Sequence, residues 1–437
     1  MKRISIIALT GLLLAAMTLP ASAVENIFGG YWRTRAFTQQ QFSGDNRNEE
    51  GDLSRVDTRT RLYYTAKIND KLAFHNKFEF DAVWGDDELG DIGADGQVFE
   101  IKHSYADWDM GPVTLKVGIQ GYFLNRGFTS DTDGSGAKVI WTIREGLYLP
   151  ASWIRFDEGY DNEDPTVPAK DLNKGDLDGY VASPLIFLSP TIKINPTYAF
   201  LHSREAREVE LPGLPAGALS NINGHIIGLN VDAGFDFGSI WFSGIYQTGS
   251  LKLTKKDPFA SALGPLAGKE FDLNGYILAI GGDVNAGPGD VHGQFFYASG
   301  DDDPADGDLD QHIALSSASY YWAEIMGLGI FDNQASFGAT GDKISNIYAA
   351  NIGATVKPMD KLSATLDIWY ASRAEDIVNS DGDLEDKLGT EIDLKVTYEL
   401  VDGLNLDVVG AYLFAEDATG NGEDNPIEVG TRLSLSF

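Results

Sequence analysis

The stretch Pro426–Phe437 has the sequence P-I-E-V-G-T-R-L-S-L-S-F. In an extended chain, one face of this stretch carries the apolar residues Ile427, Val429, Leu433, Leu435 and Phe437. The other face carries Glu428, Gly430, Arg432, Ser434 and Ser436. A period of two is typical of a strand, because successive side chains of a strand point to opposite sides. The stretch therefore predicts a strand with one apolar and one polar face.

The same alternation recurs from Ile27 onward, in segments near the length of a tilted membrane strand. In 72–84, for example, Phe74, Phe78 and Phe80 alternate with Lys77 and Glu79. Eighteen strands are expected, with sixteen as the alternative count. They cover 27–42, 54–68, 72–84, 97–109, 112–121, 137–144, 147–157, 176–187, 191–204, 221–235, 238–250, 271–284, 289–300, 343–357, 361–373, 388–400, 403–416 and 426–437.

The connections between these segments alternate between short turns and long polar stretches. Short turns include Asn69-Asp70-Lys71, Glu145-Gly146 and Pro358-Met359-Asp360. Long connections include 43–53, 85–96, 158–175, 205–220, 251–270 and 301–342. A β-sandwich would also alternate, but it would not need this rhythm of loop lengths. The pattern predicts an all-β, transmembrane antiparallel barrel with short periplasmic turns and long extracellular loops.

The first 23 residues read as a secretory signal peptide. Lys2 and Arg3 precede the apolar run Ile4–Leu19, and Ala21-Ser22-Ala23 offers a cleavage site. The expected division is thus a signal peptide at 1–23 and one barrel domain at 24–437. No second long apolar run follows, so no membrane-spanning helix is expected. The absence of cysteine excludes disulfides and thiolate metal sites.

Composition gives no support to catalysis or nucleic-acid binding. A net charge of −32 opposes binding to nucleic acid. The six histidines are scattered without the clustering of a metal site, and no nucleophile motif is present, so no enzyme and no cofactor are expected. Two acidic runs, 301–310 and 375–386, read as solvated loops. Their alternative role is loose Ca²⁺ or Mg²⁺ binding that bridges to lipopolysaccharide.

Basic residues concentrate on one face of the first strands. These candidate channel-lining residues, with one acidic neighbour, are Arg33, Arg35, Arg55, Asp57, Arg59, Arg61, Lys77 and Arg432. Placing a charged side chain of a membrane strand against lipid costs several kcal/mol of free energy, so this face is expected to line the lumen. Two interpretations stay open: a ladder that guides carboxylate solutes, and a rigid ion-pair network with Asp57, Glu79 and Asp81.

The connection 301–342 is longer than loops without a structural or functional role usually are, and its second half is apolar. So much apolar surface would not stay in water. The segment Tyr320–Phe331 is therefore expected to pack into the barrel mouth or against a neighbouring subunit. Tyr320, Tyr321 and Trp322 are the candidate constriction residues.

The whole chain resembles a Gram-negative outer-membrane porin of the sixteen- to eighteen-stranded proteobacterial kind. The resemblance lies in Phe437 at the tip of its strand, in Arg59-Thr60-Arg61-Leu62 and in Tyr320–Gly327. It implies passive diffusion of small hydrophilic solutes through the outer membrane, with both termini periplasmic. It also implies contact with lipid and lipopolysaccharide, recognition of Phe437 by the barrel-assembly machinery, and a homotrimer. The alternative function is a polysaccharide exporter or the sheath of a porin-cytochrome electron-transfer conduit.

Overall fold

The computed structural model describes residues 24–42, 52–86, 99–158, 175–204, 218–255, 263–303, 306–333, 335–336, 338–379, 382–420 and 424–437. In its first half the strands are β1 (Glu25–Gln40), β2 (Leu53–Asn69), β3 (Leu72–Val83), β4 (Glu100–Asp109), β5 (Val113–Leu124), β6 (Ser130–Arg144), β7 (Leu147–Asp157), β8 (Leu177–Ala182), β9 (Leu185–Ser189) and β10 (Ile192–Ser203). The second half holds β11 (Leu219–Phe235), β12 (Gly238–Leu253), β13 (Glu270–Leu273), β14 (Tyr276–Ala286), β15 (Gly289–Ala298), β16 (Asp308–Leu309), β17 (Ile347–Met359), β18 (Leu362–Val378), β19 (Leu384–Val401), β20 (Leu404–Ala415) and β21 (Ile427–Ser436).

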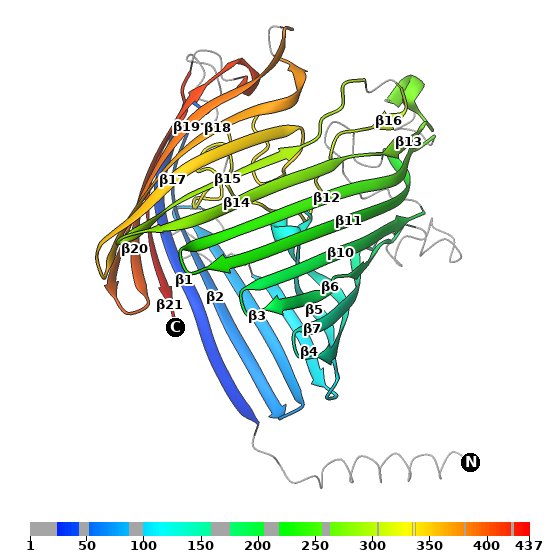
Figure 1. Cartoon of the computed structure of the whole chain (residues 1–437), viewed down its shortest axis with the longest axis vertical. Helices are drawn as coiled ribbons and strands as arrows, with labels where there is room; N and C mark the ends of the chain where they lie inside the picture. The colour runs from blue at the N-terminus through cyan, green and yellow to red at the C-terminus, as the bar shows by residue number, and fades with distance from the viewer. Residues whose placement is uncertain are drawn as a thin grey trace.

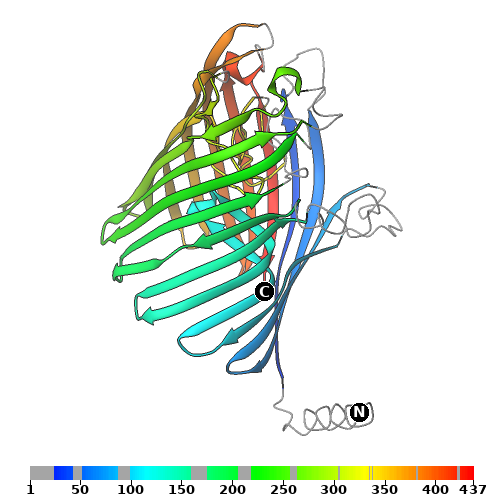
Figure 2. The same ribbon diagram turned by 90° about the vertical axis from the view of Figure 1, so that its right-hand side faces the viewer.

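These strands form a closed antiparallel barrel (Figures 1 and 2). β8 and β9 together make one wall strand between β7 and β10, and β13 and β14 make another beside β12. β16 lies in a connection, so the 21 strands form eighteen wall strands in the described chain. β21 closes the wall by pairing with β1, with Arg432 opposite Arg35. The predicted fold class and the count of eighteen are confirmed.

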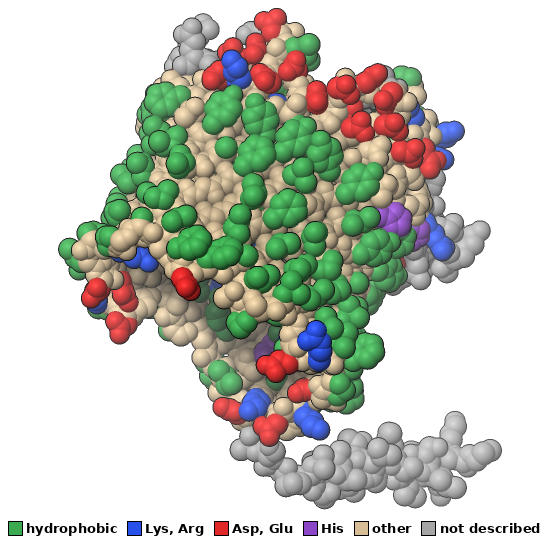
Figure 3. Space-filling model, in the orientation of Figure 1, with side chains coloured by type: hydrophobic (Ala, Val, Ile, Leu, Met, Phe, Trp, Pro, Cys, Tyr) green, Lys and Arg blue, Asp and Glu red, His purple; other side chains and the backbone are tan. Residues whose placement is uncertain are grey.

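The alternation sorts side chains between the two faces of the wall. Phe74, Phe80 and Leu394 point outward and are exposed, whereas Glu79 and Asp393, on the same strands, point inward and are buried. Figure 3 shows apolar side chains spread over the outer face, with acidic side chains gathered at the end that carries the long connections. We call this end the loop end and the opposite one the turn end. An apolar outer band with polar rims is what a barrel in lipid requires.

The inside of the barrel holds an apolar core that strict alternation does not predict. Ile277, Phe296, Ala349 and Trp369 face inward from β14, β15, β17 and β18, and each is at most 2 % exposed. They pack against the connection 299–346, here called the inner loop, which joins β15 to β17. These strands are apolar on both faces because lipid covers one face and the inner loop covers the other.

Two sequence-based boundaries were wrong. The strand expected at 137–144 begins at Ser130, because the polar residues 130–136 pair fully with β5. The acidic run 375–386 is not a loop: β18 reaches Val378 and β19 begins at Leu384, so the connection covers only 379–383. The signal peptide at 1–23 lies outside the described residues. Among the described residues, no helix is long and apolar enough to cross a membrane.

The seam between β1 and the chain end depends on a glycine. Gly30 exchanges backbone hydrogen bonds with Phe437, N to O at 2.8 Å and O to N at 3.2 Å. A Cβ at position 30 would lie 2.4 Å from the Phe437 ring and 2.8 Å from the Arg61 carbonyl oxygen. Gly30→Val is therefore expected to lower the temperature at which the folded barrel loses its compact electrophoretic mobility. Gly410→Val, where a Cβ meets open space, is the control; equal losses in both variants would contradict this reading of the seam.

Candidate functional site

Two chain segments enter the lumen and meet at its centre. The connection 125–129, between β5 and β6, begins with Asn125 and Arg126 in the left-handed region, at φ of 51° and 60°. The Asn125 amide donates to Thr129 Oγ1 at 2.9 Å and accepts from Asn230 at 2.9 Å. Such backbone strain persists only where surrounding contacts hold it. The turn then meets the inner loop: Ser319 N donates to Gly127 O at 3.0 Å, and Phe128 stacks on Tyr320 at 4.0 Å.

The tip of the inner loop is fixed to the wall by buried carboxylates. Glu391 on β19 accepts hydrogen bonds from the backbone N–H groups of Ile325, at 2.6 Å, and Met326, at 2.9 Å. Asp393 accepts from Glu324 N at 3.2 Å. These hydrogen bonds give partners to backbone N–H groups of the loop tip that would otherwise be buried without any. On the opposite flank, Arg35 donates to the carbonyl oxygens of Ile330 and Phe331.

The three predicted constriction residues play different parts in this arrangement. Trp322 is 8 % exposed and packs edge-on against Trp369, at 5.1 Å, and Phe296, at 5.3 Å. The Tyr320 hydroxyl donates to Gln294 Oε1 at 2.5 Å within the core. Tyr321 is 45 % exposed, and its hydroxyl donates to Asp332 at 2.7 Å. Trp322 and Tyr321 line the open space described next, whereas Tyr320 packs against Phe128 and Phe296.

The open space is a cavity of about 1030 Å³ between the inner loop and the wall formed by β1–β6, β19 and β21; we call it the main cavity. Its basic lining residues are Arg33, Arg59, Arg61, Lys77, Lys102, His103, Lys395 and Arg432. Its acidic lining residues are Glu79, Asp131, Asp133, Glu324 and Asp332. Because the inner loop and the apolar core fill the β14–β18 side of the lumen, the open space lies on the opposite side of the barrel.

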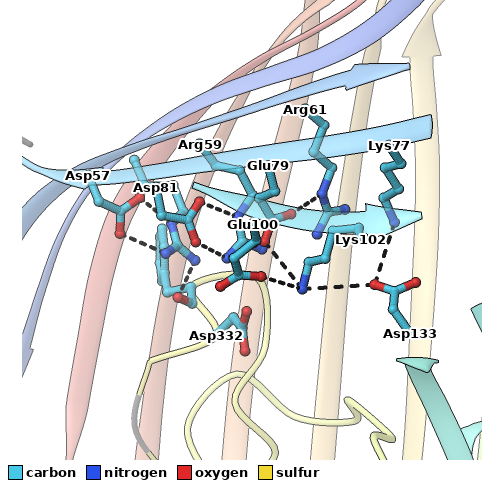
Figure 4. Close-up of polar contacts among 12 residues, drawn as sticks. Asp57, Arg59, Arg61, Lys77, Glu79, Asp81, Glu100, Lys102, Asp133 and Asp332 are labelled. Carbon is cyan, nitrogen blue, oxygen red and sulfur yellow. Dashed lines mark hydrogen bonds and ion pairs between the residues drawn. The ribbon is translucent and has the colours of Figure 1, made fainter. Parts of the chain in front are cut away.

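Most of the basic side chains are engaged in ion pairs, several of which appear in Figure 4. Arg59 binds Asp81, Nε to Oδ1 at 2.7 Å, and approaches Glu79 at 3.5 Å. Glu79 also binds Arg61, and Lys102 lies 3.5 Å away. Further pairs are Lys102–Glu100 at 3.0 Å, Lys102–Asp133 at 3.9 Å, His103–Asp133 at 2.8 Å, Lys77–Asp133 at 4.0 Å, Arg35–Asp57 at 2.6 Å and Arg432–Asp407 at 2.8 Å. The wall is therefore a network of alternating charges.

Two further cavities adjoin the main one. The mouth cavity, about 310 Å³, lies toward the loop end and includes Arg35, Arg55 and Asp57; Arg33, Arg59 and Asp332 line both spaces. The side cavity, about 340 Å³, lies beyond Tyr122 on the β6–β11 wall. Its lining is mostly apolar, with Lys138, Lys193 and Asp232 among its charged residues. A continuous set of lining residues thus leads from the mouth cavity into the main cavity.

The structure places all eight predicted channel-lining residues on the inner face of adjoining strands. Arg33, Arg59, Arg61, Lys77 and Arg432 line the main cavity, and Arg35, Arg55 and Asp57 line the mouth cavity. Sequence reasoning missed Lys102, His103, Asp133, Glu324 and Asp332. Lys395 lies on the polar face of the expected strand 388–400, but nothing in the sequence indicates that this strand, β19, lies near the arginines of β1 and β2. That link depends on barrel closure through β20 and β21.

The base of the inner loop contains a buried histidine. His312 is 1 % exposed, its Nδ1 lies 3.1 Å from Ile344 O, and its Nε2 has no partner among the described residues. Burial lowers the pKa of His312 to about 4. Farther along the loop, burial raises the pKa of Glu324 above its usual range.

The lowered pKa gives the loop base a pH dependence. Between pH 6.5 and 4, His312 binds a proton when the chain around it opens to water but not while it is buried. The free energy that keeps this part of the inner loop closed therefore decreases as pH falls, by roughly 3 kcal/mol at most. The protection factors of the His312 and Ile313 amides against hydrogen exchange, corrected for the intrinsic pH dependence of exchange, should fall accordingly. His312→Gln should flatten the response; an unchanged pH response in that variant would contradict the assignment.

No protein-family model matches the sequence, and no curated protein matches it. Solved structures match its fold. Pseudomonas aeruginosa OpdK, crystallised with vanillate, aligns with a TM-score of 0.58 and 10% identity over 94% of this chain and 98% of that one. Acinetobacter baumannii OccAB1 aligns with a TM-score of 0.56 and 15% identity over 95% and 99%. Pseudomonas aeruginosa OccK11 (OpdR) aligns with a TM-score of 0.56 and 11% identity over 94% and 96%. The chain has the eighteen-stranded fold of these outer-membrane porins.

Proposed function

We propose that the protein is a water-filled channel of the Gram-negative outer membrane, through which small hydrophilic solutes diffuse passively. The observation that carries the proposal is the main cavity. A charged cavity lies inside a wall whose outer face is apolar, and the inner loop borders this cavity without filling it. A lumen with charged walls next to a lipid-facing apolar band is the arrangement of a porin.

We further propose that the channel favours solutes bearing carboxylates. The passage is bordered on the wall side by guanidinium and ammonium groups, which bind carboxylate oxygens through charge-assisted hydrogen bonds. The likeness to OpdK with bound vanillate, itself a carboxylate, is consistent with this preference. The inner loop argues against the alternative of a conduit sheath or polymer exporter, since its apolar core takes up part of the lumen.

Planar-bilayer recording tests the proposal. Purified protein is expected to insert with stepwise increases in current, and each step should saturate only weakly with KCl concentration. Organic carboxylates added to one side should reduce the current more than neutral sugars of equal size do. A barrel that inserts, as shown by its protease protection in vesicles, yet passes no current would overturn the channel proposal.

A further inference from the structure

Two basic side chains of the main cavity differ from all the others that line it. Arg33 on β1 and Lys395 on β19 have neither an ion pair nor a side-chain hydrogen bond with any described residue, whereas the other basic residues of this cavity each have an acidic partner. The exposed fraction of Arg33 is only 8 %, and its Nε is buried without a partner. A buried guanidinium without a counter-charge is costly, so such a group is a candidate for ligand binding.

The surroundings of Arg33 increase this cost. In the sheet register, Arg33 lies directly opposite Arg59 on β2 and opposite Ser434 on β21. Like charges placed opposite each other destabilise a sheet. The nearby carboxylates Asp57 and Asp81 are already bound by Arg35 and Arg59. A conflict of this kind, among basic residues of the main cavity that all have an acidic partner apart from Arg33 and Lys395, is typical of a functional position.

Lys395 occupies a comparable position across the cavity. Its register partners are Thr365 on β18 and Val409 on β20, which offer no counter-charge. Successive pairings through β20 and β21 place Lys395 level with Phe37, four residues from Arg33 along β1. With strands about 4.8 Å apart and a rise of about 3.3 Å per residue, the two Cα atoms lie roughly 20 Å apart. Both side chains line the main cavity, so a ligand that contacts the two charged groups must be extended along the wall.

We propose that the main cavity binds an organic dianion, a linear dicarboxylate with a few carbons between its two ends. One carboxylate binds Arg33 and the other binds Lys395, while Asp332 on the loop side repels the carboxylates toward the wall. This inference rests on the proposed channel function and specifies its solute. Two separated cations without partners match two separated negative groups; a monocarboxylate satisfies only one of them.

The test uses single-channel recording of the full barrel with a series of probes: succinate, glutarate, adipate, pimelate and suberate, each beside the monocarboxylate of equal chain length. Dissociation constants are taken from the concentration dependence of current block. Binding is expected to be tightest at one intermediate chain length and about tenfold tighter there than for the matched monocarboxylate, the gain of one charge-assisted hydrogen bond. Arg33→Gln and Lys395→Gln should each abolish this optimum.

Lys138→Gln is the matched control, because it removes one positive charge from the side cavity. It should leave the optimum and the ratio of dicarboxylate to monocarboxylate affinity unchanged. Affinity that rises with charge alone, without an optimum, would overturn the two-point site. So would an optimum that survives in both Arg33→Gln and Lys395→Gln. Either result can occur in a conducting barrel, so failure of this inference is distinct from failure of the channel proposal, which is absence of current.

Discussion

Replacing Arg55, Arg59 and Arg61 together with glutamine is expected to shift the channel strongly toward cations. Arg59 and Arg61 compensate Asp81 and Glu79, and Glu79 is only 2 % exposed. Without these arginines both carboxylates remain in the wall, and Glu79 keeps Lys102, at 3.5 Å, as an ion-pair partner. A charge about 4 Å from a permeating ion contributes on the order of 1 kcal/mol even in water, so three removed charges should change the cation-to-anion permeability ratio about tenfold or more.

Reversal potentials in a KCl gradient measure this shift, and low ionic strength should enlarge it because salt screens exposed charges. The matched control replaces Lys71, Lys357 and Lys361 with glutamine, which removes three positive charges from exposed positions at the turn end. A triple arginine variant that conducts and selects like the parent would mean that the arginines serve only as members of a structural ion-pair network.

The second large effect is expected from Trp322→Ala. Trp322 packs against Phe296 and Trp369, and its indole N–H donates to Gly341 O at 2.8 Å. Removing a buried tryptophan side chain costs about 3–5 kcal/mol and leaves a cavity beside the passage. The inner loop should therefore lose its fixed position, so the single-channel conductance should rise and the current become noisier.

Trp141→Ala is the comparison for this variant, since Trp141 is 52 % exposed on the outer face and does not line the passage. It should leave conductance unchanged. A quiet channel of parental conductance in Trp322→Ala would show that the loop does not narrow the pore. Deleting 311–335 is a less direct test, because the deletion would also uncover the apolar inner faces of β15 and β18.

The barrel could be predicted from the sequence because a membrane strand needs only a period of two, and Leu394 and Asp393 on β19 satisfy it directly. The inward direction of Arg33 and Arg59 could also be predicted, because charges on a membrane strand avoid lipid, whereas their pairing opposite each other is seen only in the structure. The inner core could not be predicted: Ile277 and Phe296 break the alternation because the inner loop covers them, a contact made across the lumen. The hydrogen bond from the Ile325 N–H to Glu391 could not be predicted either, because it too is made across the lumen by residues far apart in the sequence.

The most direct test of the central claim uses the absence of cysteine from the chain. Thr132→Cys places one thiol on the wall of the main cavity, and Ala349→Cys places one in the inner core, where the residue has no exposed surface. A bulky, water-soluble, negatively charged thiol reagent is added while a single channel conducts. We predict a stepwise fall in current for Thr132→Cys and none for Ala349→Cys. Unchanged current in Thr132→Cys, with modification confirmed by mass spectrometry, would contradict the claim that ions pass through this cavity.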